Sequence, residues 1–208
     1  MIRVTKPGKL RLAVLASGRG SNFDALCRAV ESGDLNAELR LLISDKKEAL
    51  AIKKAKSRGI KPVYIEPAEF PNREEYEKTM VRILNDHNIN MVALAGYMRL
   101  VGSTFLQAFN LRVVNIHPAL LPSFTGLHAQ KQALDYGVRY SGCTVHIVDA
   151  GMDTGPIIMQ SVVPVYQDDT EESLSSRILV EEHKIYWRAL QLFAEGRIFI
   201  DGHKVIIK

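Results

Sequence analysis

The sequence has no apolar run of the roughly 20 residues that a membrane-spanning helix needs. Its basic first residues, Met1 to Lys6, are not followed by a long apolar stretch and a small-residue cleavage site, so a secretory signal is not indicated. The hydrophobic share of 47% and the charged share of 24% argue against a disordered chain. We therefore expect a globular, cytoplasmic protein with no membrane partner.

Cysteine is scarce, and metal-binding motifs are missing. Only Cys27 and Cys143 occur, and neither lies in a CxxC motif, so we expect two buried thiols. The 6 histidines are scattered, without an HExxH motif or a His/Cys cluster. The sequence therefore predicts no metal site.

The net charge is only +4, and much of the basic excess lies between Lys46 and Lys61. On a helix such residues usually form a solvated face, although a basic balance also suits phosphorylated or polycarboxylate ligands. The basic residues are not interleaved with aromatic ones, so nucleic acid is not an expected partner.

From Leu10 onward, apolar runs alternate with amphipathic stretches. The expected strands are 11–17, 39–43, 62–65, 91–95 and 111–116, and the expected helices are 22–31, 49–58, 72–87 and 104–109. This alternation predicts an α/β fold: a single-domain, Rossmann-like, mostly parallel sheet with helices on both faces.

The pattern changes after Gly126 and predicts a mixed C-terminal part. We expect a helix over 129–136, strands over 140–148 and 156–165, a helix over 171–193 and a hairpin over 197–207. Residues 1–10 are expected to be an N-terminal tail, and 11–208 a single domain.

A glycine-rich loop, Ser17 to Asn22, separates the first expected strand from the first helix. Its glycines allow a tight turn, Ser21 and Asn22 can cap the helix, and free amides at a helix start favour an anion. Phe23 replaces the third glycine of the dinucleotide fingerprint, and no Gly-Lys-Ser/Thr follows. A phosphate site and a plain glycine turn both remain open.

The strand that ends near Pro118 carries two polar side chains. Asn115 and His117 lie on the same side of this strand by period-2 alternation, at the carboxyl end where open α/β sheets bind ligands. An amide and an imidazole together can stabilise an oxyanion, although a strand-end histidine can also be structural.

A later glycine-rich loop carries Asp153. A carboxylate beside an imidazole would raise the pKa of that imidazole and fix its orientation. Asp153 can equally be a turn aspartate, so its functional interpretation depends on whether it lies close to His117.

Six motifs, taken in order, resemble the phosphoribosylglycinamide formyltransferases, the folate-dependent enzymes of purine synthesis, over residue 11 to the end. These motifs are residues 17–22, 94–100, 115–122, 126–129, 142–149 and 152–156. The resemblance implies that the chain transfers the formyl group of 10-formyltetrahydrofolate to the amine of phosphoribosylglycinamide. The products are formylglycinamide ribonucleotide and tetrahydrofolate, in de novo purine synthesis.

The resemblance also implies roles for individual residues. Asn115, His117 and Asp153 match the catalytic residues. The phosphoribosyl substrate would contact Gly20, Ser21, Asn22 and Glu182. The folate would contact Arg73, Met98, Arg99, Leu100, Val101, Asn115, Val148, Asp149 and Ala150. Ala119 and Leu179 depart from the family pattern at ligand contacts. No metal is implied, and the chain could be a monomer or a homodimer.

The implied reaction begins when the substrate amine attacks the formyl carbon. Protonated His117 and the amide of Asn115 would stabilise the resulting oxyanion, and Asp153 would keep His117 protonated. Neither cysteine lies in a motif that would supply a nucleophile.

Two alternatives stay open at this point. A formyltetrahydrofolate hydrolase or a formyltransferase acting on initiator methionyl-tRNA shares the fold, but each usually carries an extra domain that 208 residues do not accommodate. Pro118 and the segment 126–128 also favour the glycinamide enzyme. The second alternative is a non-catalytic nucleotide-binding module in which Asn115 and His117 are structural.

Overall fold

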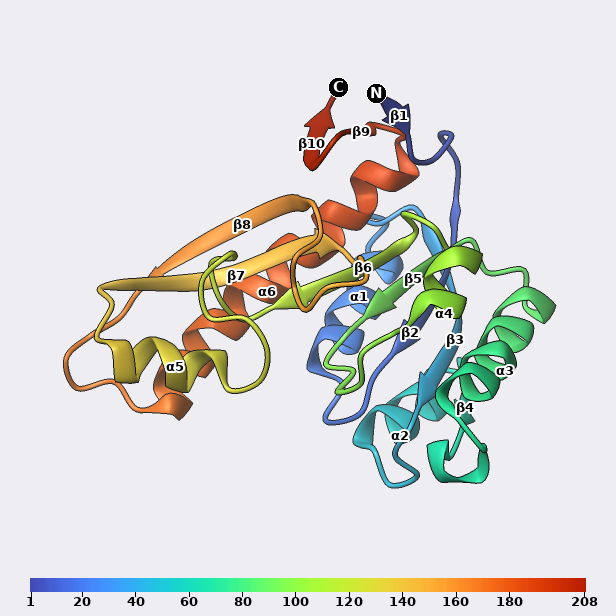
Figure 1. Ribbon diagram of the computed structural model, residues 1–208, viewed down its shortest axis with the longest axis horizontal. Coiled ribbons are helices and arrows are strands. Elements are labelled where there is room, and N and C mark those ends of the chain that lie inside the picture. The colour runs from blue at the N-terminus through green and yellow to red at the C-terminus, as the bar shows by residue number, and fades with distance from the viewer.

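The computed structural model describes all residues, 1–208, and contains a seven-stranded sheet and a three-stranded sheet (Figure 1). The order in the large sheet is β4-β3-β2-β5-β6-β7-β8; the first five are parallel, and β7 is antiparallel to both of its neighbours. These strands are β2 (Leu10–Leu15), β3 (Ala37–Ser44), β4 (Lys61–Tyr64), β5 (Met91–Leu94), β6 (Val113–His117), β7 (Tyr140–Ile147) and β8 (Ile157–Pro164). The predicted α/β class, with a mostly parallel sheet and a mixed C-terminal part, is confirmed.

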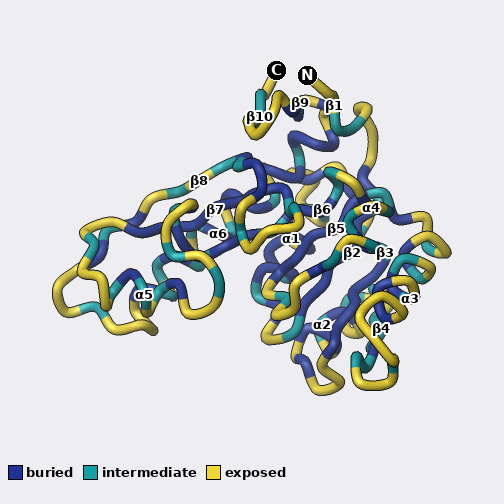
Figure 2. The backbone as a smooth tube through the Cα atoms, viewed as in Figure 1, coloured by how far each residue is buried: buried dark blue, intermediate teal, exposed yellow.

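The central strands are apolar on both faces because both faces are covered. In β2, Leu12 and Val14 belong to one buried hydrophobic cluster, whereas Ala13 and Leu15 belong to another on the opposite face. Figure 2 shows the strands of the sheet mostly in dark blue, as buried chain, and the loops mostly in yellow, as exposed chain. This two-sided burial explains why the sequence of β2 shows a continuous apolar run.

Helices pack against both faces of the sheet. The face that carries Leu12 is covered by α1 (Ser21–Glu31), α2 (Leu50–Ser57) and α6 (Glu171–Ala194), and the other face by α3 (Arg73–Asp86) and α4 (Ser103–Ala108). The remaining helical segments are η1 (Pro67–Glu69) and α5 (Ala129–Tyr136). None of the helices combines the length and the apolar character needed to span a bilayer.

The first residues of the chain pair with its last ones. The small sheet has the order β1-β9-β10, formed by β1 (Ile2–Arg3), β9 (Ile198–Asp201) and β10 (Lys204–Ile207), and the two chain ends lie side by side in Figure 1. The Val4 amide donates to the Ile198 carbonyl at 3.0 Å. Residues 2–4, within the expected tail, therefore pair with the edge of the C-terminal hairpin, and Leu10 already belongs to β2. A local sequence pattern does not reveal this long-range pairing.

Tyr186 joins the long helix α6 to the centre of the sheet. Its side chain is completely buried, and its hydroxyl lies 2.8 Å from the Leu94 carbonyl and 3.1 Å from the Val114 carbonyl. Leu94 is the last residue of β5, and Val114 lies in β6 directly before Asn115. The hydroxyl therefore joins α6 to the two strands beside the polar residues of the next section.

We expect Tyr186→Phe to lower the free energy of unfolding by about 1 to 2 kcal/mol, because two buried carbonyls lose a hydroxyl partner. Urea denaturation of the variant and the wild type measures the difference. Tyr140→Phe is the matched control, since Tyr140 is 65% exposed. Equal stability of the Tyr186 variant and the wild type would show that the hydroxyl does not hold the strands.

Candidate active site

The candidate site begins at the carboxyl end of β6. Asn115 and His117 project from this strand, and antiparallel pairing with β7 sets Asn115 opposite His146 and His117 opposite Thr144. His117 is only 4% exposed, so its imidazole lies in a largely dry environment. The pairing with β7 adds a second imidazole to the two side chains expected from the sequence.

Asp153 lies beside His117, the contact on which its functional interpretation depended. Its Oδ2 atom is 3.4 Å from His117 Nδ1 and accepts a hydrogen bond of 2.8 Å from the Gly126 amide. On the other side of the imidazole ring, Nε2 lies 2.8 Å from the Phe124 carbonyl. The ring is thus fixed between the 118–128 loop and the loop that joins β7 to β8.

His146 completes the cluster and was not singled out from the sequence. Its Nε2 atom lies 3.2 Å from the Asn115 amide nitrogen and 3.6 Å from Asp153 Oδ1, and its Nδ1 lies 3.0 Å from the Ile147 carbonyl. The carbonyl can only accept, so Nδ1 carries a proton, while Nε2 faces both the Asn115 amide and the Asp153 carboxylate. His146 therefore sets the orientation of the Asn115 amide.

Burial decides the protonation of His117. Removal from water lowers the pKa of His117 below its ordinary value of 6.5, and the Phe124 carbonyl and the Asp153 carboxylate oppose this only in part. The expectation that Asp153 keeps His117 protonated near neutral pH is therefore wrong for the unliganded protein. Burial alone would raise the pKa of Asp153, but the neighbouring His146 ring, the hydrogen bond from the Gly126 amide and the charge of His117 bring it below its usual range.

The glycine-rich loop brings the predicted substrate residues to the start of α1. Gly20 has a left-handed φ of 68°, and a Cβ on it would lie 2.8 Å from the Cβ of Ala51, so a larger residue does not fit. No side chain caps the start of α1, contrary to the expectation that Ser21 or Asn22 would do so. Its first amides are left free at the positive end of the helix, which is an arrangement that binds anions.

Asn22 bonds to another helix instead of capping its own. Its amide nitrogen donates to Glu182 Oε2 at 2.8 Å, and both side chains are buried. Burial raises the pKa of Glu182, and the bond from Asn22 offsets part of that rise. All four residues expected to contact the phosphoribosyl substrate thus lie near the junction of α1 and α6.

The segments expected to contact folate leave the two strands that flank β6. After β5, the side chains of Met98 and Leu100 are 62% and 59% exposed, whereas Val101 is buried. Arg73 reaches this segment from α3 and donates to the Leu100 carbonyl at 2.6 Å. After β7, Val148, Asp149 and Ala150 lead into the loop that carries Asp153, and the Val148 amide donates to the Val113 carbonyl. Arg99 also lies in the first segment, with its guanidinium 5.6 Å from the Tyr76 ring centre.

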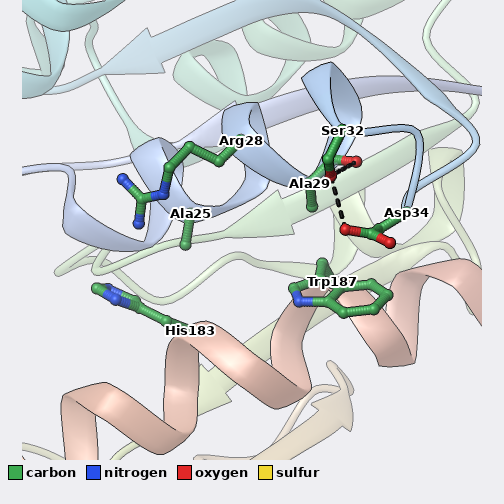
Figure 3. Close-up of a pocket in the computed structure, with 7 residues that line it drawn as sticks. All are labelled: Ala25, Arg28, Ala29, Ser32, Asp34, His183 and Trp187. Carbon is green, nitrogen blue, oxygen red and sulfur yellow. Dashed lines mark hydrogen bonds between the residues drawn. The ribbon is translucent and has the colours of Figure 1, made fainter.

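A pocket of about 220 Å³ lies elsewhere, between α1 and α6 (Figure 3). It contains His183, whose pKa is lowered by burial and by Arg28, but none of the predicted catalytic residues. Its lining residues are Ala25, Arg28, Ala29, Ser32, Asp34, His183 and Trp187. No group of three or more His, Cys, Asp or Glu side chains in the structure is arranged to hold a metal ion.

Comparison with known proteins gives consistent matches. Residues 10–190 match the family described as Formyl transferase. The chain is 43% identical over 176 residues to the phosphoribosylglycinamide formyltransferase of Bacillus subtilis, which covers 85% of this chain and 90% of that protein. It resembles the crystal structure of glycinamide ribonucleotide transformylase 1 from Symbiobacterium toebii with a TM-score of 0.95 and 45% identity, over 96% of this chain and 94% of that one.

A longer relative matches the chain over only a small part of its own length. The trifunctional purine biosynthetic protein adenosine-3 of Drosophila pseudoobscura pseudoobscura is 43% identical over 198 residues, which are 94% of this chain and 14% of that protein. This chain therefore spans about one seventh of the length of that relative.

We expect His117 to titrate below 6.5 in NMR spectra of its ring protons, because burial disfavours the charged form. Asp153→Asn should move the pKa of His117 lower still, since the carboxylate is one of the groups that raise it. A value above 6.5 in the wild type would contradict the dominance of burial.

The same shift has a consequence for stability. The unfolded state binds more protons than the folded state between the folded pKa and 6.5, so the contribution of His117 is fully present above 6.5 and is lost as the pH falls below it. His117→Asn should flatten this part of the pH dependence of the free energy of unfolding.

Proposed function

The chain belongs to the formyl transferase family, and we propose that it transfers the formyl group of 10-formyltetrahydrofolate to the amine of phosphoribosylglycinamide. The products are formylglycinamide ribonucleotide and tetrahydrofolate, and the reaction is a step of de novo purine synthesis. We further propose that residues 11–208 form the catalytic domain and that the protein works in the cytoplasm, with no nucleic acid, membrane or metal as partner.

One observation carries this proposal: the buried His117 and His146 rings and the half-buried Asn115 and Asp153 side chains form a single cluster at the end of β6. The cluster combines an amide with a free N–H, an imidazole whose pKa is lowered by burial and a carboxylate that orients it. These are the groups that an acyl transfer between two nitrogen atoms requires for charge stabilisation and proton movement. The comparisons support this choice of reaction, because the chain matches a phosphoribosylglycinamide formyltransferase over 90% of that protein's length.

The acceptor substrate would bind at the start of α1. Its phosphate suits the free amides of Gly20 and Ser21 at the positive end of the helix. Asn22 and Glu182 would contact its sugar, since a carboxylate accepts hydrogen bonds from hydroxyl groups. The donor folate would lie along the segment from Met98 to Val101, whose exposed Met98 and Leu100 side chains offer an apolar surface to its rings.

In the chemical step, the amine nitrogen forms a bond with the formyl carbon, and the carbonyl oxygen becomes a tetrahedral oxyanion. The Asn115 amide keeps an N–H free, because the protein supplies no other hydrogen-bond partner for it besides His146. A well-placed donor of this kind contributes roughly 3 to 4 kcal/mol of transition-state stabilisation. Asn115 therefore acts as an oxyanion donor.

The proton of the attacking nitrogen must reach N10 of the folate before the carbon–nitrogen bond to N10 breaks. His117 suits this transfer because its neutral ring can accept a proton, and the pKa lowered by burial favours releasing that proton again. The negative charge of the intermediate raises the proton affinity of the ring, and Asp153 stabilises the imidazolium as it forms. No covalent enzyme intermediate is required.

The direct test mixes the protein with phosphoribosylglycinamide and 10-formyltetrahydrofolate and measures release of tetrahydrofolate. We expect release only when both substrates are present, because the acceptor amine supplies the nucleophile. Release without the acceptor would identify a hydrolase instead, and binding of the phosphoribosyl compound without any turnover would identify a binding module.

We expect His117→Ala to lower kcat by at least about 100-fold, the usual worth of an acid–base group. The matched control is His203→Ala, because His203 is exposed in the turn between β9 and β10 and should leave kcat unchanged. Steady-state kinetics of both variants provide the measurement. Near-wild-type turnover of the His117 variant would rule out a catalytic role for this ring.

A further inference from the structure

Glu77 is a buried carboxylate that the proposed reaction does not use. It lies in the first half of α3, on the face that also buries Tyr76, Met80 and Leu84 against the sheet, and it is 2% exposed. A carboxylate in such a place is costly unless hydrogen bonds satisfy it completely. The hydrogen-bond partners of the Glu77 carboxylate therefore indicate its structural role.

The partners of Glu77 hold one short stretch of backbone. Its Oε1 atom accepts from the Gly102 amide at 2.5 Å and from Arg73 Nε at 2.8 Å, and its Oε2 accepts from the Phe105 amide at 3.3 Å. Arg73 in turn donates to the Leu100 carbonyl at 2.6 Å. The Arg73–Glu77 ion pair therefore bonds to the Leu100 carbonyl and to the Gly102 amide, at the two ends of residues 100–102.

Glu77 also replaces a missing helix cap. The helix α4 has only six residues and receives no side-chain cap from its own N-cap residue, Gly102. Glu77 reaches across from α3 and accepts from two amides that a helix start leaves free. The approach is so close that a Cβ on Gly102 would lie 2.8 Å from Glu77 Oε1 and 2.9 Å from Arg73 Nε.

Residues 100–102 overlap the Met98–Val101 segment, which is proposed to contact the formyl donor. Val101 is buried and anchors the segment, while Met98 and Leu100 project from it. At its other end, the Met98 amide donates to Ser17 Oγ at 3.0 Å. With Ser17 at one end and the Arg73–Glu77 pair at the other, the backbone between Met98 and Gly102 is fixed before any ligand arrives.

We propose that Glu77 is a positioning residue for the formyl donor: it holds Arg73 and the Met98–Gly102 backbone in the conformation that binds folate. This inference rests on the proposed function, because it takes the Met98–Val101 segment as the folate contact. Glu77 touches neither substrate. Its removal should therefore weaken donor binding and leave acceptor binding at α1 unaffected.

The test is Glu77→Gln, which keeps the shape of the side chain but puts an amide NH₂ where the backbone N–H groups and Arg73 need an acceptor. We expect the KM for 10-formyltetrahydrofolate to rise roughly tenfold or more, the effect of losing a charge-assisted hydrogen bond. The KM for phosphoribosylglycinamide should stay within about twofold, because neither Glu77 nor Arg73 makes a hydrogen bond to the loop at the start of α1. Amide exchange at Gly102 and Phe105 should also become faster.

Glu74→Gln is the matched control on the same helix. Glu74 is exposed and pairs only with Lys78, so this variant should keep both KM values and the exchange rates of the wild type. Equal KM values in Glu77→Gln and the wild type would overturn the proposal. A parallel rise in both KM values, with a lower melting temperature, would also overturn it, because that pattern indicates general destabilisation.

Two further measurements cover the cases in which the variant does not fold or the wild type shows no activity. If Glu77→Gln does not fold, Gly102→Ala makes the same test, because its methyl group displaces the carboxylate; the same selective rise is expected, and unchanged KM values overturn the proposal. If the wild type shows no formyl transfer, the proposed function fails. Amide exchange at residues 98–105 then still decides whether Glu77 holds the segment.

Discussion

The contact between the His117 imidazole and the Asp153 carboxylate, 3.4 Å apart, is the interaction on which the site depends. It requires the loop after β7 to turn back to the end of β6, and two residues adopt a left-handed backbone around the ring: Asp153 with φ 56° and Phe124 with φ 55°. Each such conformation of a residue other than glycine costs about 1 to 3 kcal/mol, and such residues recur at active sites. The surrounding hydrogen bonds from His117 and Gly126 offset that cost.

Exclusion of water gives this contact its chemical character. The same burial that lowers the pKa of His117 raises that of Glu182, so two groups with opposite charges both move toward their neutral forms. A charge that develops during a reaction is not screened there by bulk water, and a nearby dipole such as the Asn115 amide acts on it more strongly than it would in solution. The site is therefore better suited to stabilise a transient charge than to carry a permanent one.

Local patterns in the sequence predicted the features that are determined within a single strand or helix. Alternation within residues 113–117 placed Asn115 and His117 on one face of β6. The continuous apolar run within residues 11–17, which results from burial on both faces, identified β2 as a strand. His146 and Glu77 were missed because their importance depends on which elements become neighbours: His146 faces Asn115 only when β7 runs antiparallel to β6. The direction of the His117 pKa was also missed, since a nearby carboxylate can be guessed from sequence but the extent of burial cannot.

The strand order explains why a two-substrate site forms here. From β2 the chain moves outward through β3 to β4, and it then returns to the other side of β2 to form β5 and β6. At such a reversal, the loops that follow the two central strands turn away from each other and leave a crevice at their carboxyl ends. The glycine-rich loop follows β2 and the Met98 segment follows β5, so the proposed acceptor and donor contacts meet at this reversal. The bond from the Met98 amide to Ser17 Oγ joins the two loops directly. A fixed distance between them matters because an amine can attack a formyl carbon only when both are held within van der Waals contact.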